Sequence, residues 1–191
     1  MDMNTKMAAI SLEKETMTGP ELYEMGDIGP AELVKGEIVE LMPTGHPHGY
    51  IEAIIAALLV MFVRKQKSGR VLTGEVGVYT ERNPDTVRGM DVAFISNERL
   101  SQVKSKSYLD VAPELVVEVM SPDDRWSSVQ EKLAEYFAIG VKLIWVIDPR
   151  LEQVHVYRSL TEVERLTSDD NLTGGEVLPS FEVTVAELFA G

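Results

Sequence analysis

Two carboxylates stand inside stretches that otherwise read as buried β-strands. Residues 113–120 run Pro-Glu-Leu-Val-Val-Glu-Val-Met, and residues 87–95 are apolar apart from an arginine and Asp91. Valines that follow a proline are typical of a strand, and alternation puts Glu118 on the same face as two apolar neighbours. A carboxylate in such surroundings costs free energy unless it pairs with a cation or accepts a hydrogen bond from a donor. Asp91 and Glu118 are therefore the first candidates for chemistry.

This pair of acids has the chemistry of a metal site. Two carboxylates that meet in an apolar sheet repel each other, so one pKa rises or a cation enters between them. Oxygen ligands of this kind suit Mg²⁺ or Mn²⁺, with a substrate phosphate completing the coordination shell. Such an ion activates water and stabilises charge on a transferring phosphate. The sequence thus predicts that Asp91 and Glu118 bind Mg²⁺ or Mn²⁺.

Lys132 is the third candidate. It lies on a predicted helix over residues 126–139, directly after the strand of Glu118 and near the edge of the helix's apolar face. Its stem can lie against the core while the ammonium reaches a neighbouring strand end. From there it could orient the attacking water or neutralise charge on the phosphate. The alternative is an ordinary lysine on a helix surface.

Length and composition favour one domain. The chain has 191 residues, 45% of them hydrophobic, and we expect a loose arm over residues 1–16 followed by a single domain over 17–191. The absence of cysteine excludes disulfides and thiolate metal sites and suits the cytoplasm. A polar N-terminus predicts no signal peptide, and the apolar run 53–63 is too short to span a bilayer.

The net charge limits the possible partners. At −13, with a pI near 4.7, the chain is not a general binder of polyanions, which need a basic surface. A nuclease whose basic residues are local and whose acids hold a metal is not excluded. The basic residues Arg64, Lys65, Lys67 and Arg70 cluster, and we favour their role at a helix C-terminus over a phosphate-binding patch.

The remaining pattern indicates an α+β or mixed α/β protein. We expect helices over 18–25, 50–67 and 126–139 and from 184 onward, and strands over 31–42 (a hairpin), 70–80, 87–95, 113–120, 142–147, 154–158 and 162–166. Gly74 and Gly77 suggest a bulge or bend in the strand 70–80. His46 and His48 fall in a predicted loop over 43–49, at a spacing that is not typical of metal ligands.

Five motifs in order resemble the putative restriction endonuclease family within the PD-(D/E)XK nuclease superfamily. They are Lys35–Glu40, Arg88–Ile95, Pro113–Pro122, Glu131–Tyr136 and Gly140–Pro149. The resemblance implies a restriction-endonuclease-like core, a central mixed β-sheet flanked by helices. It further implies that Asp91 and Glu118 are metal-binding acids of an endonuclease that cuts nucleic acid, most plausibly DNA. A homodimer would suit duplex cleavage.

The resemblance adds one acid and shows two departures. Glu37, on the predicted hairpin, would be a further metal-binding acid; its alternative is a solvated surface charge. The proline that precedes the motif's aspartate is Met90 here, and the lysine expected two residues after Glu118 is Met120. Migration of that lysine to the following helix is known in the superfamily, and Lys132 fits the migrated place.

Two other classes of function stay open from the sequence. The chain could be a catalytically silent binding or assembly module, in which protein donors satisfy the acids. It could also hydrolyse a small phosphoester, which would tolerate an acidic surface better than a polymer does.

Overall fold

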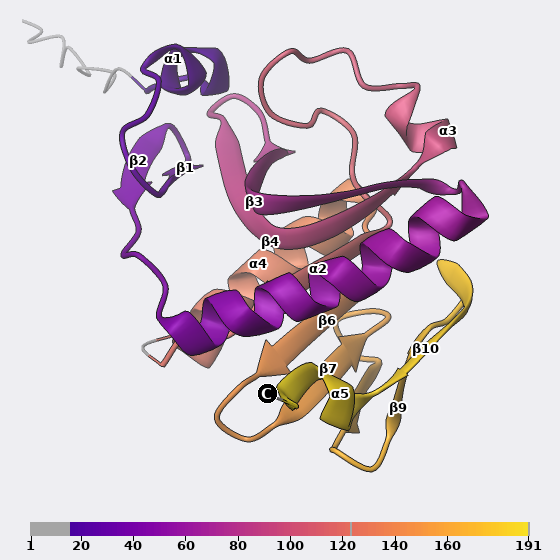
Figure 1. Ribbon diagram of the computed structural model, residues 1–191. Helices are drawn as coiled ribbons and strands as arrows, with labels where there is room; N and C mark the ends of the chain where they lie inside the picture. Colours follow the sequence, from indigo (N-terminus) through magenta and orange to yellow (C-terminus); the bar gives the residue numbers. More distant parts are fainter. Residues whose placement is uncertain (1–15, 123, 191) are drawn as a thin grey trace, which may run out of the picture.

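An eight-stranded mixed sheet forms the centre of the molecule (Figure 1). The computed structural model describes residues 16–122 and 124–190, so most of the predicted arm over 1–16 lies outside the described residues. The strand order is β2-β1-β4-β5-β6-β7-β8, and β3 pairs with β4 beside this path. The strands are β1 (Ala31–Val34), β2 (Glu37–Glu40), β3 (Gly69–Glu81), β4 (Thr86–Ser96), β5 (Leu115–Val119), β6 (Leu143–Asp148), β7 (Gln153–Tyr157) and β8 (Val163–Leu166). The pairing of β5 with β6 is parallel, so the predicted mixed α/β class is confirmed.

Helices cover both faces of the sheet. They are α1 (Gly19–Glu24), α2 (His46–Gln66), α3 (Asn97–Leu100), α4 (Trp126–Ile139) and α5 (Val185–Phe189). In Figure 1, α2 crosses in front of the sheet and α4 lies behind it. The alternation of β5 divides its side chains between two cores: Val117 packs in the core that contains α2, and Val116 packs in the core that contains α4.

Three features of the chain differ from the sequence prediction or add to it. The loop expected over 43–49 is wrong from His46 onward, because α2 begins there with Pro47 in its first turn, where proline is tolerated. The one-turn helix α3, which directly follows β4, adds to the predicted elements. A separate hairpin of β9 (Asn171–Gly174) and β10 (Leu178–Thr184) was not predicted.

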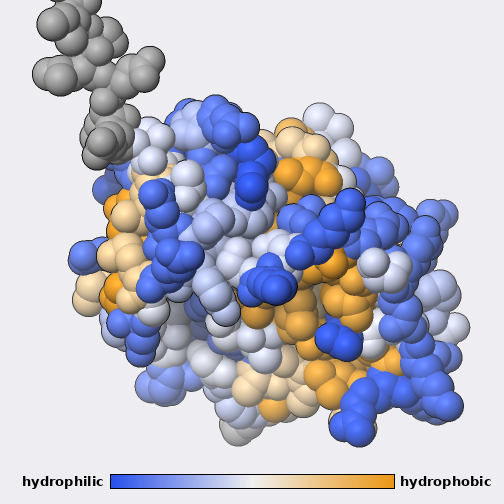
Figure 2. Space-filling model, turned by 90° about the horizontal axis from the view of Figure 1, so that it is seen from above, coloured by the Kyte–Doolittle hydropathy of each residue, from blue (hydrophilic) through white to orange (hydrophobic). Residues whose placement is uncertain are grey.

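By length and composition alone, helix α2 could cross a membrane, since the mean hydropathy of its most apolar stretch is 1.5. The helix lies against the sheet, and Ile55 and Leu59 on its inner face are fully buried. Packing against the sheet therefore accounts for the apolar residues of this inner face, and we assign α2 to the core. On the outside, hydrophobic residues gather in patches among hydrophilic ones on the face shown in Figure 2.

One edge of β4 lacks a backbone partner over a short stretch between the strands β1 and β5. The other edge pairs with β3 from Thr86 to Ser96, with two shifts of register. On the open edge, Val87 pairs with Leu33 of β1 and Val92 pairs with Val117 of β5. In the described residues neither strand supplies a register partner for residues 88–91, which lie between these two pairs. We call this stretch the β4 gap, and the candidate site is built around it.

Candidate active site

Asp91 lies in the β4 gap and makes a contact that a neighbouring strand would otherwise make. Its Oδ2 accepts a hydrogen bond of 2.6 Å from the backbone N–H of Val119, the residue after Glu118. The β4–β5 ladder ends at Val92 and Val117, so the side chain replaces the next backbone contact. Only 5% of Asp91 is exposed. The sequence prediction that Asp91 is a buried acid beside the strand of Glu118 is confirmed.

Glu118 lies beside this contact and has two partners from α4. Its Oε1 is 2.8 Å from the Tyr136 hydroxyl, and its Oε2 is 3.6 Å from the Lys132 ammonium. Burial raises the pKa of Glu118 to about 8; Lys132 and the Tyr136 hydroxyl oppose this shift, whereas the charge of Asp91 adds to it. Tyr136 also lies 3.2 Å from the carbonyl oxygen of Gly89, so it links α4 to the β4 gap.

Lys132 points into the cluster rather than to solvent. Its Nζ is 2.8 Å from Oε1 of Glu32, and the alternative of an ordinary surface lysine does not describe it. Burial alone would lower the pKa of Lys132, but the adjacent carboxylates of Glu118 and Glu32 raise it above its usual value. The side chain therefore keeps its proton. It can supply positive charge and hydrogen bonds, but it is not a base.

The hairpin does supply an acid to this cluster, but that acid is Glu32 on β1. Glu32 is 3% exposed, and its Oε1 also accepts a hydrogen bond of 3.1 Å from the backbone N–H of Gly89. Glu37 is exposed on β2, where it pairs with Val34 at the turn end of the hairpin. The structure thus brings Asp91, Glu118 and Lys132 together, and Glu32 occupies the place that we had predicted for Glu37.

Arg88 connects Glu32 to α4. Its Nη1 is 2.9 Å from Glu32, and its Nη2 and Nε are 2.6 and 2.8 Å from the two carboxylate oxygens of Glu135. This fork-to-fork geometry raises the pKa of Arg88 further above its usual value, chiefly through Glu135. Arg88, which Glu135 holds, contacts Oε2 of Glu32, whereas Lys132 contacts Oε1, so the acid that supports Lys132 is itself fixed.

His48 reaches Asp91 from the first turn of α2. Its Nε2 is 3.3 Å from Asp91 Oδ2, and the residue is buried. Burial lowers the pKa of His48, but the hydrogen bond and charge of Asp91 outweigh this and raise it above its usual value. His48 is thus a second donor to Asp91. From the sequence, His48 falls in a predicted loop, because the helix start at His46 has no side-chain cap that would mark it.

Glu75 approaches Asp91 from a bulge in β3. The register shifts between Thr73 and Val76, and both bulge residues have positive φ, +87° for Gly74 and +56° for Glu75. The bulge predicted from the glycines is confirmed. A Cβ added at Gly89 would lie 2.7 Å from Oε2 of Glu75, so glycine leaves the room for this carboxylate.

The carboxyl of Glu75 joins the electrostatics of the site although the residue as a whole is exposed. Its carboxyl end is shielded from water, which raises the pKa of Glu75 to about 7, and the charge and hydrogen bond of Asp91 contribute to this shift. A strained, positive φ at a non-glycine residue often marks a functional position. Glu75 belongs to none of the sequence motifs. The neighbouring glycines, which predict the bulge, are therefore the sequence signal that could have pointed to it.

The donors at the β4 gap fit a hard divalent cation. Asp91 and Glu118 offer carboxylate oxygens. Burial, with a smaller contribution from the charge of Asp91, raises the pKa of Glu118, and a cation bound there would stabilise its charged form. Within residues 16–122 and 124–190, no three histidine or acidic side chains lie close enough together to enclose an ion. An ion would therefore be held by two carboxylates and completed by water and substrate oxygens, as Mg²⁺ commonly is.

Comparison with known proteins identifies the family of the chain. A family model described as "Uma2: Putative restriction endonuclease" matches residues 20–186. The chain belongs to this family. The predicted resemblance is thereby confirmed, and membership of this family supports a nuclease function.

A solved structure shows the same fold. It is described as a putative nuclease belonging to DUF820 from Anabaena variabilis ATCC 29413, and it is similar to this chain with a TM-score of 0.75 and 22% identity. The match covers 91% of this chain and 97% of that one. At this identity the likeness is one of fold, and it confirms the predicted nuclease-like core. No curated protein matches the chain.

Proposed function

We propose that the protein is a Mg²⁺- or Mn²⁺-dependent phosphodiesterase that cleaves nucleic acid, with DNA as its substrate. The observation that carries the proposal is the convergence of the buried Asp91, the partly buried Glu118 and a charged lysine at the β4 gap. Oδ2 of Asp91 lies 2.6 Å from the backbone nitrogen of Val119. Oε2 of Glu118, the residue before Val119, lies 3.6 Å from Nζ of Lys132. Acids from adjacent strands with one cation beside them form the arrangement expected of a metal-assisted phosphodiesterase.

Each residue has a separate task in this proposal. Asp91 and Glu118 would hold the divalent ion, which when bound polarises the scissile phosphate and makes water a better nucleophile. Lys132, which keeps its proton, would orient the attacking water or stabilise the charge that develops on the phosphate. Glu32 holds the Lys132 ammonium in position at 2.8 Å, and Tyr136 fixes the Glu118 carboxylate. Neither Glu32 nor Tyr136 needs to touch the substrate.

The biological form that we propose is a homodimer acting on DNA in the cytoplasm. In such a dimer two copies of the site are related by a two-fold axis, and each copy would cut one strand of a duplex. A monomer would nick one strand, whereas a dimer would convert a supercoiled plasmid directly to the linear form. Sedimentation velocity together with the ratio of nicked to linear product tests this part of the proposal.

A catalytically silent binding module is the second candidate, and one observation favours it. The acids already have protein donors: Val119 and His48 for Asp91, and Tyr136 and Lys132 for Glu118. Such partners can satisfy buried carboxylates without any metal. The two candidates differ in whether a divalent ion binds and whether phosphodiesters are cleaved.

A substrate panel tests the proposed class. Supercoiled plasmid, single-stranded DNA, RNA and bis(p-nitrophenyl) phosphate are each incubated with millimolar Mg²⁺ or Mn²⁺, using the wild type and Asp91→Asn. We expect metal-dependent cleavage of DNA by the wild type and none by Asp91→Asn. Cleavage of the small diester alone would instead assign the site to small phosphoesters, and no cleavage of any substrate would favour the silent module.

A further inference from the structure

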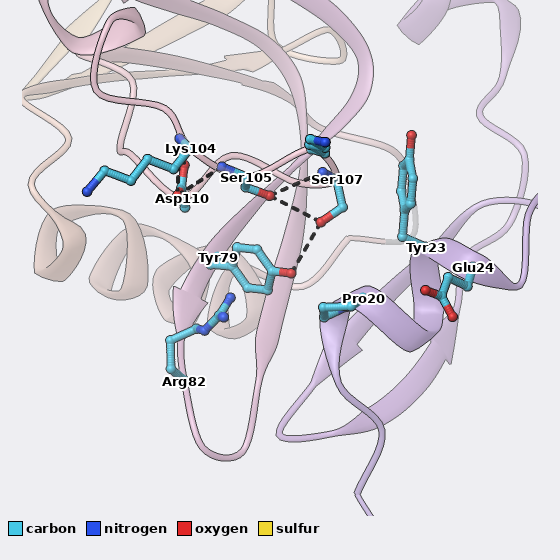
Figure 3. Close-up of a pocket in the computed structure, with 10 residues that line it drawn as sticks. Pro20, Tyr23, Glu24, Tyr79, Arg82, Lys104, Ser105, Ser107 and Asp110 are labelled. Carbon is cyan, nitrogen blue, oxygen red and sulfur yellow. Dashed lines mark hydrogen bonds between the residues drawn. The ribbon is translucent and has the colours of Figure 1, made fainter.

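A cavity separate from the acid cluster lies between α1 and the loop that follows α3. Its volume is about 610 Å³. One wall is α1, with Pro20 and Tyr23; the other consists of Tyr79 and Arg82 at the end of β3 and of the loop residues around Ser105 (Figure 3). The proposed reaction uses none of these residues.

Aromatic rings line this cavity, and one of them is open to solvent. Tyr108 packs edge-on against both Tyr23 and Tyr79, with ring centroids 5.8 and 5.9 Å apart. Arg82 lies over the ring of Tyr79, its guanidinium carbon 3.9 Å from the centroid. Tyr23 is 54% exposed, so ring surface stays available for a planar ligand.

Cations gather around these rings in a chain of net charge −13. Arg82, Lys104 and Lys106 line the cavity, together with the acids Glu24 and Asp110. The Asp110 carboxylate already accepts the backbone N–H groups of Lys104 and Ser105 at 3.1 to 3.3 Å, so the loop itself uses much of its accepting capacity. Arg82 is itself 3.4 Å from Asp85, so within the described residues Lys104 and Lys106 supply the positive charge of the lining that no acid pairs.

The combination of stacking rings and cations identifies a ligand class. Bases stack on aromatic side chains whatever their sequence, while Lys and Arg contact the phosphates that join them. We infer that this cavity binds a nucleotide unit within a single strand of nucleic acid, with the base on Tyr23 and the phosphate near Arg82, Lys104 and Lys106. The inference rests on the proposed function, because the strand would be part of the substrate.

The position of the cavity suits a substrate that also reaches the β4 gap. Tyr79 pairs with Val87 of β4, four residues before Asp91. At about 3.3 Å per residue, this pairing lies roughly 13 Å along the strand from the acid. A strand held at the cavity would therefore need to extend by only a few nucleotides to reach the acids.

Binding without cleavage tests the inference. A fluorescein-labelled oligothymidylate of about 15 nucleotides is titrated with full-length protein in EDTA, and fluorescence anisotropy is recorded. We expect Tyr23→Ala to weaken binding by about 5- to 150-fold, the usual range for loss of one stacked base, and Tyr23→Phe to bind like the wild type. The double variant Lys104→Ala/Lys106→Ala should reduce the slope of log K against log salt by about 1.4.

Control measurements separate this inference from its competitors. The control variant Arg64→Ala/Lys65→Ala removes as much charge as Lys104→Ala/Lys106→Ala does, but from the exposed end of α2. Its affinity for the oligothymidylate should stay within about twofold of that of the wild type after correction for net charge. Unchanged binding by Tyr23→Ala, or equally strong binding of thymidine monophosphate or of polyglutamate, would overturn the inference. Wild-type protein that binds the strand in EDTA but cleaves nothing with metal would instead contradict only the proposed function.

Discussion

At the scale of single residues, Glu118 is an acid whose surroundings oppose its charge. Burial raises its pKa from 4.5 to about 8. Between these two values the Glu118 carboxyl therefore binds more protons in the folded state than in the unfolded state. The contribution of Glu118 to the free energy of unfolding therefore falls as the pH rises through this window.

Replacing Glu118 with glutamine should remove this pH dependence. Glutamine has no proton to lose, so Glu118→Gln should lack part of the decline in stability that the wild type shows from about pH 5 to about pH 8. Urea denaturation at several pH values measures the difference in the free energy of unfolding between the two proteins. We expect this difference to change in favour of the variant as the pH rises. A difference that stays constant over this window would show that Glu118 is charged throughout.

At the scale of secondary structure elements, the site depends on what the β1–β2 hairpin places beside β4. Glu32 touches Arg88, Lys132 and the N–H of Gly89 at once. Removing a carboxylate between the buried Arg88 and the partly buried Lys132 leaves both charges without this partner. We therefore expect Glu32→Ala to lower the free energy of unfolding by about 3–5 kcal/mol. Glu40→Ala, at an exposed position of the same hairpin, should change it by less than about 0.5 kcal/mol.

Denaturation in urea, monitored by circular dichroism, measures both variants. A loss of less than about 1 kcal/mol for Glu32→Ala would mean that Arg88 and Lys132 find other partners and that Glu32 does not position the lysine. Rescue by Glu32→Gln would show that hydrogen bonding, and not charge, is the essential contribution.

The elements were predictable from the sequence because their patterns are local. The apolar spacing of α2 and α4 and the alternation of β5 depend on neighbours within a few residues. The choice between Glu32 and Glu37 is not local, since it depends on how β1 meets β4 through the pair of Leu33 and Val87. The sequence therefore indicated an acid from the hairpin, and the structure places Glu32 rather than Glu37 beside Lys132.

Other parts of the site were hidden for related reasons. Glu75 reaches Asp91 only because a bulge turns β3 and because Gly89 leaves space across the strand pair. His48 was assigned to a loop because prolines and glycines around it masked the start of α2. The hairpin of β9 and β10 is short and has an irregular register, so its alternation was too brief to recognise.

At the scale of the whole molecule, metal binding should appear as added stability. An ion that binds only the folded state stabilises it by about 2.7 kcal/mol at 100 times its dissociation constant. For a chain of this size, that corresponds to a rise in Tm of roughly 5–10 °C. We expect saturating Mn²⁺ to raise the Tm of the wild type and to leave the Tm of Asp91→Asn and Glu118→Gln unchanged.

Differential scanning calorimetry with and without Mn²⁺ measures these shifts, with Glu40→Gln as a control that should respond like the wild type. The silent-module alternative predicts no metal-dependent shift in any variant and marked destabilisation by Asp91→Asn, since its protein donors would lose their charged acceptor. An equal rise in all four proteins would indicate metal binding at a place other than the β4 gap.

The most direct test of the account is cleavage of supercoiled plasmid, scored as the sum of nicked and linear product, by the wild type and by Lys132→Ala in Mg²⁺, with circular dichroism to verify that the variant is folded. The wild type should cleave the plasmid only when the metal is present. Lys132→Ala should be slower by about 10²–10³-fold, the usual effect of removing one group aimed at the charge of the transition state. A folded Lys132→Ala protein that cleaves at the wild-type rate, while Asp91→Asn does not cleave, would contradict the assignment of Lys132.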